Sequence, residues 1–196
     1  MATEQHPLKP YLPENARILM LGSFPTSRKR WCMPFIYPNF QNDMWRIVGL
    51  CFFADKNRFV DPDSKTFLQS DIEQFLHHVG IALYDTASEV VRQRNTASDK
   101  DLLVVTPTDL DALLERIPLC EAIVTTGQLA TDLASTYFGI CEQPRVGDCV
   151  SFVRNGRNLR FYRMPSSSRA YPLGLEKKAE SYQKMFEKEI INKSKL

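Results

Sequence analysis

Aromatic rings and amide groups are interleaved along residues 35–45. Tyr37 lies close to Asn39 and Asn42, and the run ends at Trp45. Aromatic faces stack on planar rings and amides hydrogen-bond to their edges, so this combination suits a pocket for a nucleobase. The same residue types allow a structural interpretation, in which Asn42 caps a helix and Trp45 packs in the core.

Gly22, Ser23, Phe24 and Pro25 follow directly after a short apolar run. Glycine lets the backbone turn closely, and the amides beyond it can hold a phosphate or a carbonyl group. Taken alone, the pattern is also typical of an ordinary turn.

Three serines and an arginine follow Pro165. The hydroxyls of Ser166, Ser167 and Ser168, together with the charge of Arg169, could bind the phosphates of a nucleic acid. A solvated connector between two elements would have the same composition.

Hydrophobic periodicity predicts the elements that must position these residues. We expect Thr106 to cap one of the helices, with Pro107 in its first turn and Asp109 as its capping-box acid. The sequence predicts strands at residues 17–21, 81–84 and 122–126, helices from about residue 42, at 64–79, 106–116, 128–137 and from 173 onward, and a hairpin of residues 149–154 and 159–164 around Asn155-Gly156.

Strands that alternate with helices indicate an α/β fold with a mostly parallel sheet covered on both faces. In such sheets ligands bind beyond the carboxyl ends of the strands. The loops at residues 22–40 and 165–172 should therefore face each other across one cleft.

Length and composition suit one domain, because 196 residues with 43% apolar and 24% charged residues can bury one sizeable core. We expect residues 1–15 to form an extended lead-in and residues 16–196 to form the domain. The N-terminus lacks a signal-peptide pattern and no apolar run is long enough for a membrane span, which predicts a soluble cytoplasmic protein.

The charged and sulfur-containing residues exclude some classes of site. Five scattered cysteines without a C-x-x-C pair suggest neither disulfides nor zinc, so we expect no metal and no cofactor. A net charge of +2 is too small to indicate a nucleic-acid binder, although local clusters can reach phosphates. Two clusters are basic, residues 28–30 and a looser set of Arg154, Arg157, Arg160, Arg163 and Arg169.

The order of these segments resembles the uracil-DNA glycosylase superfamily. Gly-Ser-Phe-Pro follows the first strand, Asn-x-x-Trp ends the aromatic run, Thr-Gly-x-x-Ala stands at 126–130, and Pro-Ser-Ser-Ser precedes the last helix. The chain looks most like the hypoxanthine-type branch, since residues 80–85 are similar to its Gly-Ile-Ala-Leu-Trp-Asp. The resemblance implies a three-layer α/β/α sandwich and a DNA glycosylase that flips a deaminated base, hypoxanthine or uracil, out of DNA and hydrolyses its N-glycosidic bond in base-excision repair.

Roles for individual residues follow from the same resemblance. It implies catalytic roles for Asn42 and Ser23, base contacts from Phe24, Tyr37, Asn39 and Phe40, and DNA contacts from Ser166, Ser167, Ser168 and Arg169. The chain departs from the branch pattern at several positions: Asn39 replaces its His, Phe40 its Pro, Asp43 its Arg and Met44 its Phe, while Met164 stands where the main uracil enzymes carry a His.

Two other functions stay open at this point. The departures at residues 39–44 would also suit a noncatalytic nucleic-acid-binding relative with the same fold. An unrelated α/β enzyme or nucleotide-binding module has less support, because the sequence contains no G-x-G-x-x-G, Walker loop or G-x-S-x-G elbow. We expect DNA carrying a deaminated base as the partner, no membrane contact, and a monomer.

Overall fold

The structure, a computed structural model, describes residues 2–94 and 98–191. Its centre is a five-stranded sheet in the order β5-β2-β8-β10-β9, in which every neighbouring pair is parallel except β10 and β9. The strands are β2 (Ile18–Gly22), β5 (Ile81–Asp85), β8 (Ala122–Thr126), β9 (Cys149–Arg154) and β10 (Arg157–Met164). All residues of β2, β5 and β8 are buried, as expected for strands covered on both faces.

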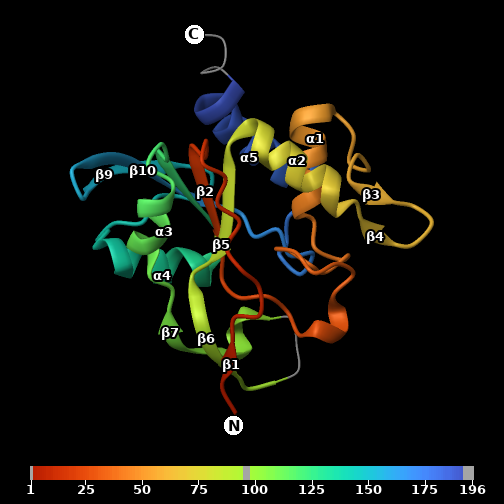
Figure 1. Ribbon diagram of the computed structural model, residues 1–196, viewed down its shortest axis with the longest axis horizontal. Coiled ribbons are helices and arrows are strands. Elements are labelled where there is room, and N and C mark those ends of the chain that lie inside the picture. The colour runs from red at the N-terminus through yellow and green to blue at the C-terminus, as the bar shows by residue number, and fades with distance from the viewer. Residues whose placement is uncertain (1, 95–97, 192–196) are drawn as a thin grey trace.

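Helices cover both faces of this sheet, which confirms the predicted three-layer α/β/α architecture (Figure 1). One layer contains α1 (Met44–Phe53), α2 (Gln69–Val79) and α5 (Leu175–Phe186), and the other contains α3 (Leu110–Arg116) and α4 (Gln128–Phe138). The Phe52 ring of α1 joins the first layer, since it lies 4.8 Å from the Phe75 ring and 4.9 Å from the Phe186 ring.

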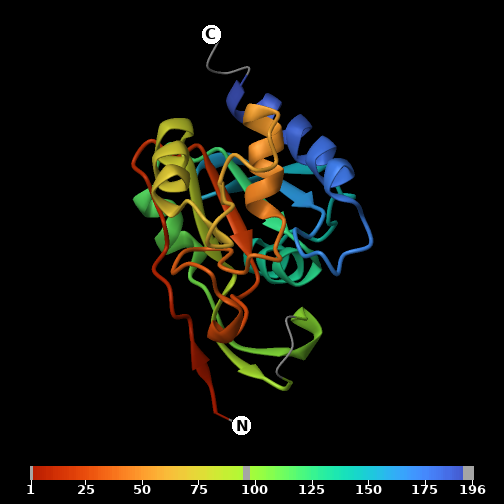
Figure 2. The ribbon, with the colours of Figure 1, turned by 90° about the vertical axis from the view of Figure 1, so that its right-hand side faces the viewer.

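A second, smaller sheet lies below the carboxyl edge of the central sheet (Figures 1 and 2). It consists of β1 (Glu4–Gln5), β6 (Ala87–Arg92) and β7 (Leu102–Pro107), all antiparallel, and a short 3-10 helix, η2 (Asp99–Asp101), precedes β7. A two-stranded hairpin, β3 (Val60–Asp61) with β4 (Thr66–Phe67), lies beside α2. The sequence patterns predicted neither of these sheets.

Two predicted helices begin later than expected. The helix expected at residues 64–79 begins at Gln69, because Thr66 and Phe67 pair with Val60 and Asp61. The helix expected at 106–116 begins at Leu110, because Thr106 and Pro107 end β7, and Asp109 caps it by accepting the Ala112 N–H at 3.1 Å. Proline is accepted at the end of an edge strand as well as in the first turn of a helix, so the sequence alone did not distinguish the two.

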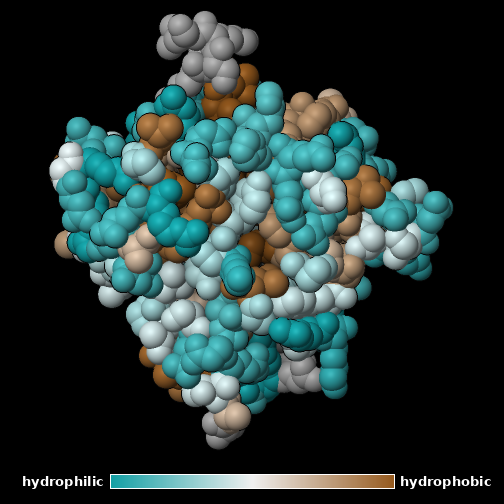
Figure 3. Space-filling model, viewed as in Figure 1, coloured by the Kyte–Doolittle hydropathy of each residue, from teal (hydrophilic) through white to brown (hydrophobic). Residues whose placement is uncertain are grey.

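The other predicted elements are confirmed. The Asn155-Gly156 turn joins β9 to β10, and α5 buries Ala179, Tyr182 and Phe186 as the apolar spacing predicted. A π-helical turn, Glu187–Ile191, extends α5, and a 3-10 turn, η1 (Arg28–Arg30), lies in the long loop after β2. Among the described residues no helix is both long and apolar enough to cross a membrane. Hydrophilic residues cover most of the face shown in Figure 3, with apolar residues in scattered patches.

Candidate active site

The carboxyl ends of three parallel strands bring polar side chains together. Gly22 ends β2, Asp85 ends β5 beside it in register, and Thr126 ends β8 on the other side of β2. A Cβ added to Gly22 would lie 2.3 Å from Asp85 Oδ1 and 3.5 Å from the Tyr37 hydroxyl. The Asp85 oxygen would overlap such a Cβ, whereas the Tyr37 hydroxyl would be in ordinary contact with it, so the close approach of Asp85 explains the Gly that begins the Gly-Ser-Phe-Pro segment. We call this cluster, with its partners His6, Ser23 and Asp99, the strand-end site.

Tyr37 reaches this site from the long loop after β2. Its backbone has a φ of 54°, which is uncommon for a residue with a side chain, and its hydroxyl shares a hydrogen bond of 2.9 Å with Thr126 Oγ1. Burial, and second the charge of Asp85, raise the pKa of Tyr37, so the hydroxyl stays protonated and neutral. The ring packs edge-on against Trp45 at 6.2 Å.

Asp85 is held from the N-terminal segment. Its Oδ2 lies 2.9 Å from Nε2 of His6, and both side chains are almost fully buried. The other ring nitrogen of His6 lies 2.9 Å from the carbonyl oxygen of Leu8, which fixes the ring orientation. The residues expected to be an extended lead-in therefore supply part of the site.

Ser23 is tied to a second carboxylate. Its hydroxyl donates to Asp99 Oδ1 at 2.7 Å, and its carbonyl accepts the Ala87 N–H at 3.1 Å. Burial raises the pKa of Asp99, the charge of Asp85 raises it further, and the Ser23 hydrogen bond and Arg92 oppose the shift. Asp99 therefore keeps its proton to a higher pH than a solvated carboxyl group does.

The Phe24 side chain packs between the His6 ring and a small apolar cluster. This side chain is 8% exposed and packs with Ala87 and Val90 in that cluster, with the His6 ring 5.2 Å away. The backbone amide of Phe24 is therefore the part that could contact a base. Beside it lies a cavity of about 320 Å³ lined by Glu4, Gln5, Pro7, Phe24, Pro25, Thr26, Ser27, Arg28 and Trp31.

Asn42 stands at the entry to α1. Its Oδ1 accepts the Met44 N–H at 2.9 Å, so the side chain satisfies an otherwise unpaired amide at the helix start. The N-cap residue of α1 is Asp43, however, and not Asn42 as the structural interpretation expected. Its backbone forms an isolated bridge with Ser168. The motif asparagine and the serine loop, residues 166–168, are consequently held side by side.

Asn39 and Phe40, which precede Asn42 in the motif, make local contacts. Asn39 Oδ1 accepts the Gln41 N–H at 3.0 Å. The Phe40 ring stacks 4.6 Å below the guanidinium of Arg46 and 5.2 Å from the Phe67 ring. Both side chains therefore shape the loop that presents Tyr37 and Asn42.

The serine loop follows β10 and reaches the same edge of the sheet. A Cβ added to Gly127, just after Thr126, would lie 3.4 Å from the Ser166 Cβ. Ser166 Oγ accepts the Ser168 N–H and Ser168 Oγ accepts the Ala170 N–H, both at 3.2 Å. Because these oxygens act as acceptors here, their hydroxyl protons remain available to an incoming anion.

Asp43 joins the loop to α1. Its carboxylate pairs with Arg169 Nε and Lys178 Nζ, each at 3.0 Å, and its backbone N–H donates to the Ser167 carbonyl at 2.9 Å. Lys178 is 1% exposed and also donates to the Ser168 carbonyl at 2.8 Å. The residue that departs most from the branch pattern is therefore a buried structural link.

The structure thus brings Ser23, Tyr37, Asn42 and the serine loop to one edge of the sheet. The Phe24 side chain lies against the His6 ring, and the Phe40 side chain packs under Arg46. The sequence patterns indicated no role for His6, Asp85, Asp99 or Thr126. The end of an apolar strand was the available signal for Asp85 and Thr126. No comparable local signal marked His6 and Asp99, because tertiary contacts bring both to the site.

Comparison with known proteins supports the fold. No protein-family model matches the sequence, and no curated protein matches it. A solution NMR structure of a proposed uracil DNA glycosylase from Methanosarcina acetivorans is similar, with a TM-score of 0.61 and 22% identity, covering 95% of this chain and 99% of that chain. The chain therefore has a uracil-DNA glycosylase-like α/β/α fold.

Proposed function

We propose that this protein is a DNA glycosylase that flips a deaminated base, hypoxanthine or uracil, out of DNA and hydrolyses its N-glycosidic bond. The observation that supports it most is the meeting of Tyr37, Asn42 and the serine loop at the carboxyl edge of the sheet. Ligands bind at this edge in open α/β sheets. The likeness in fold to the proposed uracil DNA glycosylase from Methanosarcina acetivorans adds support.

The flipped base would lie against the loop that carries Tyr37. Extruding a nucleotide costs a few kcal/mol and is easiest at a mismatch, so stacking and edge contacts must offset that cost. The Tyr37 ring offers the stacking face, and the amides around Ser23 and Phe24 offer donors to a base carbonyl. Asn39 would contribute an edge contact from the same loop.

Asn42 would orient the attacking water. Its Oδ1 already accepts the Met44 N–H, so the side chain is held in one orientation, and the second lone pair of this oxygen can accept a hydrogen bond from the water. A neutral amide cannot serve as a strong base, and its contribution would come from positioning.

The two carboxyl groups of the strand-end site, Asp85 and Asp99, would help to stabilise the charges that develop during cleavage. Cleavage develops positive charge on the sugar and negative charge on the departing base. The Asp85 carboxylate would stabilise the first, and Asp99 would act on the second indirectly, because it fixes Ser23, whose neighbouring backbone amides donate to the base. The serine loop and Arg169 would hold the flanking phosphates.

A noncatalytic nucleic-acid-binding protein is the second candidate function. The observation that favours it is the hydrogen bond between Asn42 Oδ1 and Met44, because a capping role alone would account for the asparagine. Met164 also offers no polar group where the main uracil enzymes carry a His.

A strand-cleavage assay separates the two candidates. Oligonucleotides that carry uracil, hypoxanthine or xanthine, single-stranded and paired, are incubated with the protein and then treated with alkali, which cuts at abasic sites. We expect cleavage at one or more of these lesions, and partial retention of it in Asn42→Asp, which keeps the capping oxygen. Binding of the same oligonucleotides without cleavage of any lesion would establish the noncatalytic function instead.

A further inference from the structure

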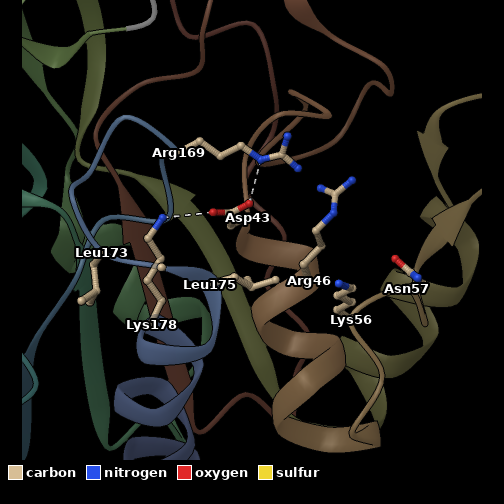
Figure 4. A pocket seen from close by; sticks show the side chains of 9 residues that line it. Asp43, Arg46, Lys56, Asn57, Arg169, Leu173, Leu175 and Lys178 are labelled. Atoms are coloured by element: carbon tan, nitrogen blue, oxygen red, sulfur yellow. Dashed lines mark hydrogen bonds and ion pairs between the residues drawn. The ribbon is translucent and has the colours of Figure 1, made fainter.

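A cavity of about 420 Å³ opens beside the serine loop (Figure 4). It lies at the N-terminal ends of α1 and α5, which run side by side in the same direction. We call it the cationic cavity, and it is lined by Asp43, Arg46, Lys56, Asn57, Arg169, Leu173, Gly174, Leu175 and Lys178.

The lining is rich in positive charge. Four of its side chains are cationic and one, Asp43, is a carboxylate. Asp43 already pairs with both Arg169 and Lys178. Positive charge therefore exceeds negative charge in a hollow next to the proposed DNA-binding loop, which favours an anion there.

Arg46 and Arg169 converge although both are cations. In Figure 4 their guanidinium groups point into the same space above Asp43. Burial, and second the charge of Arg169, lower the pKa of Arg46. Arg46 Nη1 is held in place by the Phe40 carbonyl at 2.9 Å, so the pair cannot separate freely. A bound anion would relieve this repulsion.

The starts of two helices add to the positive potential of the cavity. At the start of α5, Gly174 makes no side-chain capping hydrogen bond, whereas at the start of α1 Asn42 Oδ1 already accepts the first N–H, that of Met44. Helix N-termini carry partial positive charge and unpaired N–H groups, which favour phosphate. Glu176, in the first turn of α5, is exposed and does not line the cavity.

We propose that the cationic cavity binds a phosphate group of the DNA backbone, one that neighbours the nucleotides held by the serine loop. That the phosphate belongs to DNA rests on the proposed function, whereas the preference for an anion follows from the charges of the cavity itself. Two guanidinium groups match the paired oxygens of a phosphodiester, and Lys56 adds a flexible charge at the rim.

Lys56→Gln and Arg169→Gln test this proposal, with Arg116→Gln as the matched control. Lys56 is exposed and makes no ion pair or hydrogen bond within residues 2–94 and 98–191, so its loss should not affect folding. Arg116 is exposed at the far end of α3. Fluorescence anisotropy would measure binding to a labelled, lesion-free oligonucleotide between about 50 and 200 mM salt.

Each of the two cavity variants should weaken DNA binding and reduce the slope of log affinity against log salt by about 1, while Arg116→Gln keeps the parental slope. Parental affinity and slope in Lys56→Gln and Arg169→Gln would overturn the proposal. Lys56→Gln isolates the cavity, because Arg169 is also assigned to the phosphates beside the serine loop. Excision with an unchanged slope in Lys56→Gln refutes only the cavity, and reduced slopes without excision refute only the glycosylase.

Inorganic phosphate distinguishes a backbone phosphate from a free one. At constant ionic strength, phosphate should displace DNA from the parent protein more strongly than chloride does. Phosphate should displace DNA less strongly from Lys56→Gln than from the parent. If phosphate raises the melting temperature of the parent but does not displace DNA, the cavity binds free phosphate and the proposal is wrong.

Discussion

The strand-end site and the cationic cavity differ in how their polar groups are satisfied. In the strand-end site, Asp85 meets His6, Tyr37 meets Thr126, and Ser23 meets Asp99, each pair at 2.9 Å or less. In the cationic cavity, positive side chains outnumber the single carboxylate. The first arrangement is preorganised and suits chemistry at fixed atoms, whereas the second is completed only by an anion.

Substitution of Asp43 should have the largest effect, because Asp43 is the sole carboxylate of the cavity lining. Asp43→Ala would leave Lys178, which is 1% exposed, without its ion-pair partner. Removing one partner of a buried pair costs about 3–5 kcal/mol, so the free energy of unfolding in urea should fall by that amount.

Asp71→Ala is the matched control for that substitution. Asp71 pairs with Arg58 at 3.0 Å, but both side chains are about 40% exposed, and such pairs contribute roughly 0–1 kcal/mol. An equal loss of stability in the two variants would show that the Asp43 carboxylate is not a structural link.

Gly22→Ala tests the packing of the strand-end site. The new Cβ would meet Asp85 Oδ1 at 2.3 Å, and overpacking of this kind costs about 1–3 kcal/mol of unfolding free energy. In an Asp85→Ala background the same substitution should cost clearly less, because the clashing oxygen is gone. Equal costs in the two backgrounds, measured by urea unfolding, would contradict the close approach.

Asp99 should give the smallest effect, visible in the pH dependence of stability. Burial raises its pKa in the folded state, so the folded protein retains the proton longer than the unfolded chain. Stability relative to Asp99→Asn should therefore fall as pH rises from about 3.9, the unfolded value, to the folded pKa, and then level off. Parallel stability curves for parent and variant would argue against a buried carboxyl.

The central sheet could be predicted from sequence because its signals are local. Apolar runs that end in Gly or Asp marked β2, β5 and β8, and the Asn155-Gly156 turn marked the β9–β10 hairpin. The small sheet could not, because β1 has two residues and β7 exposes Leu103 and Val105, so neither shows a clean alternation.

The site was predictable to the extent that its residues lie in contiguous motifs. Ser23, Tyr37, Asn42 and the serine loop were identified from their segments, and the structure places them at one edge of the sheet. His6 and Asp99 lie about 79 and 76 positions from their partners Asp85 and Ser23, and such pairings depend on tertiary contacts that no local pattern encodes.

Single-turnover base excision by Asn42→Ala tests the proposed glycosylase most directly, on whichever lesion the parent cleaves. The capping role predicts a loss of about 0.5–2 kcal/mol of stability and no change in rate. The proposed water-orienting role predicts a folded variant that excises on the order of 10²-fold more slowly or worse, with little change in affinity for lesion DNA. Excision by Asn42→Ala at the parental rate would contradict the catalytic assignment.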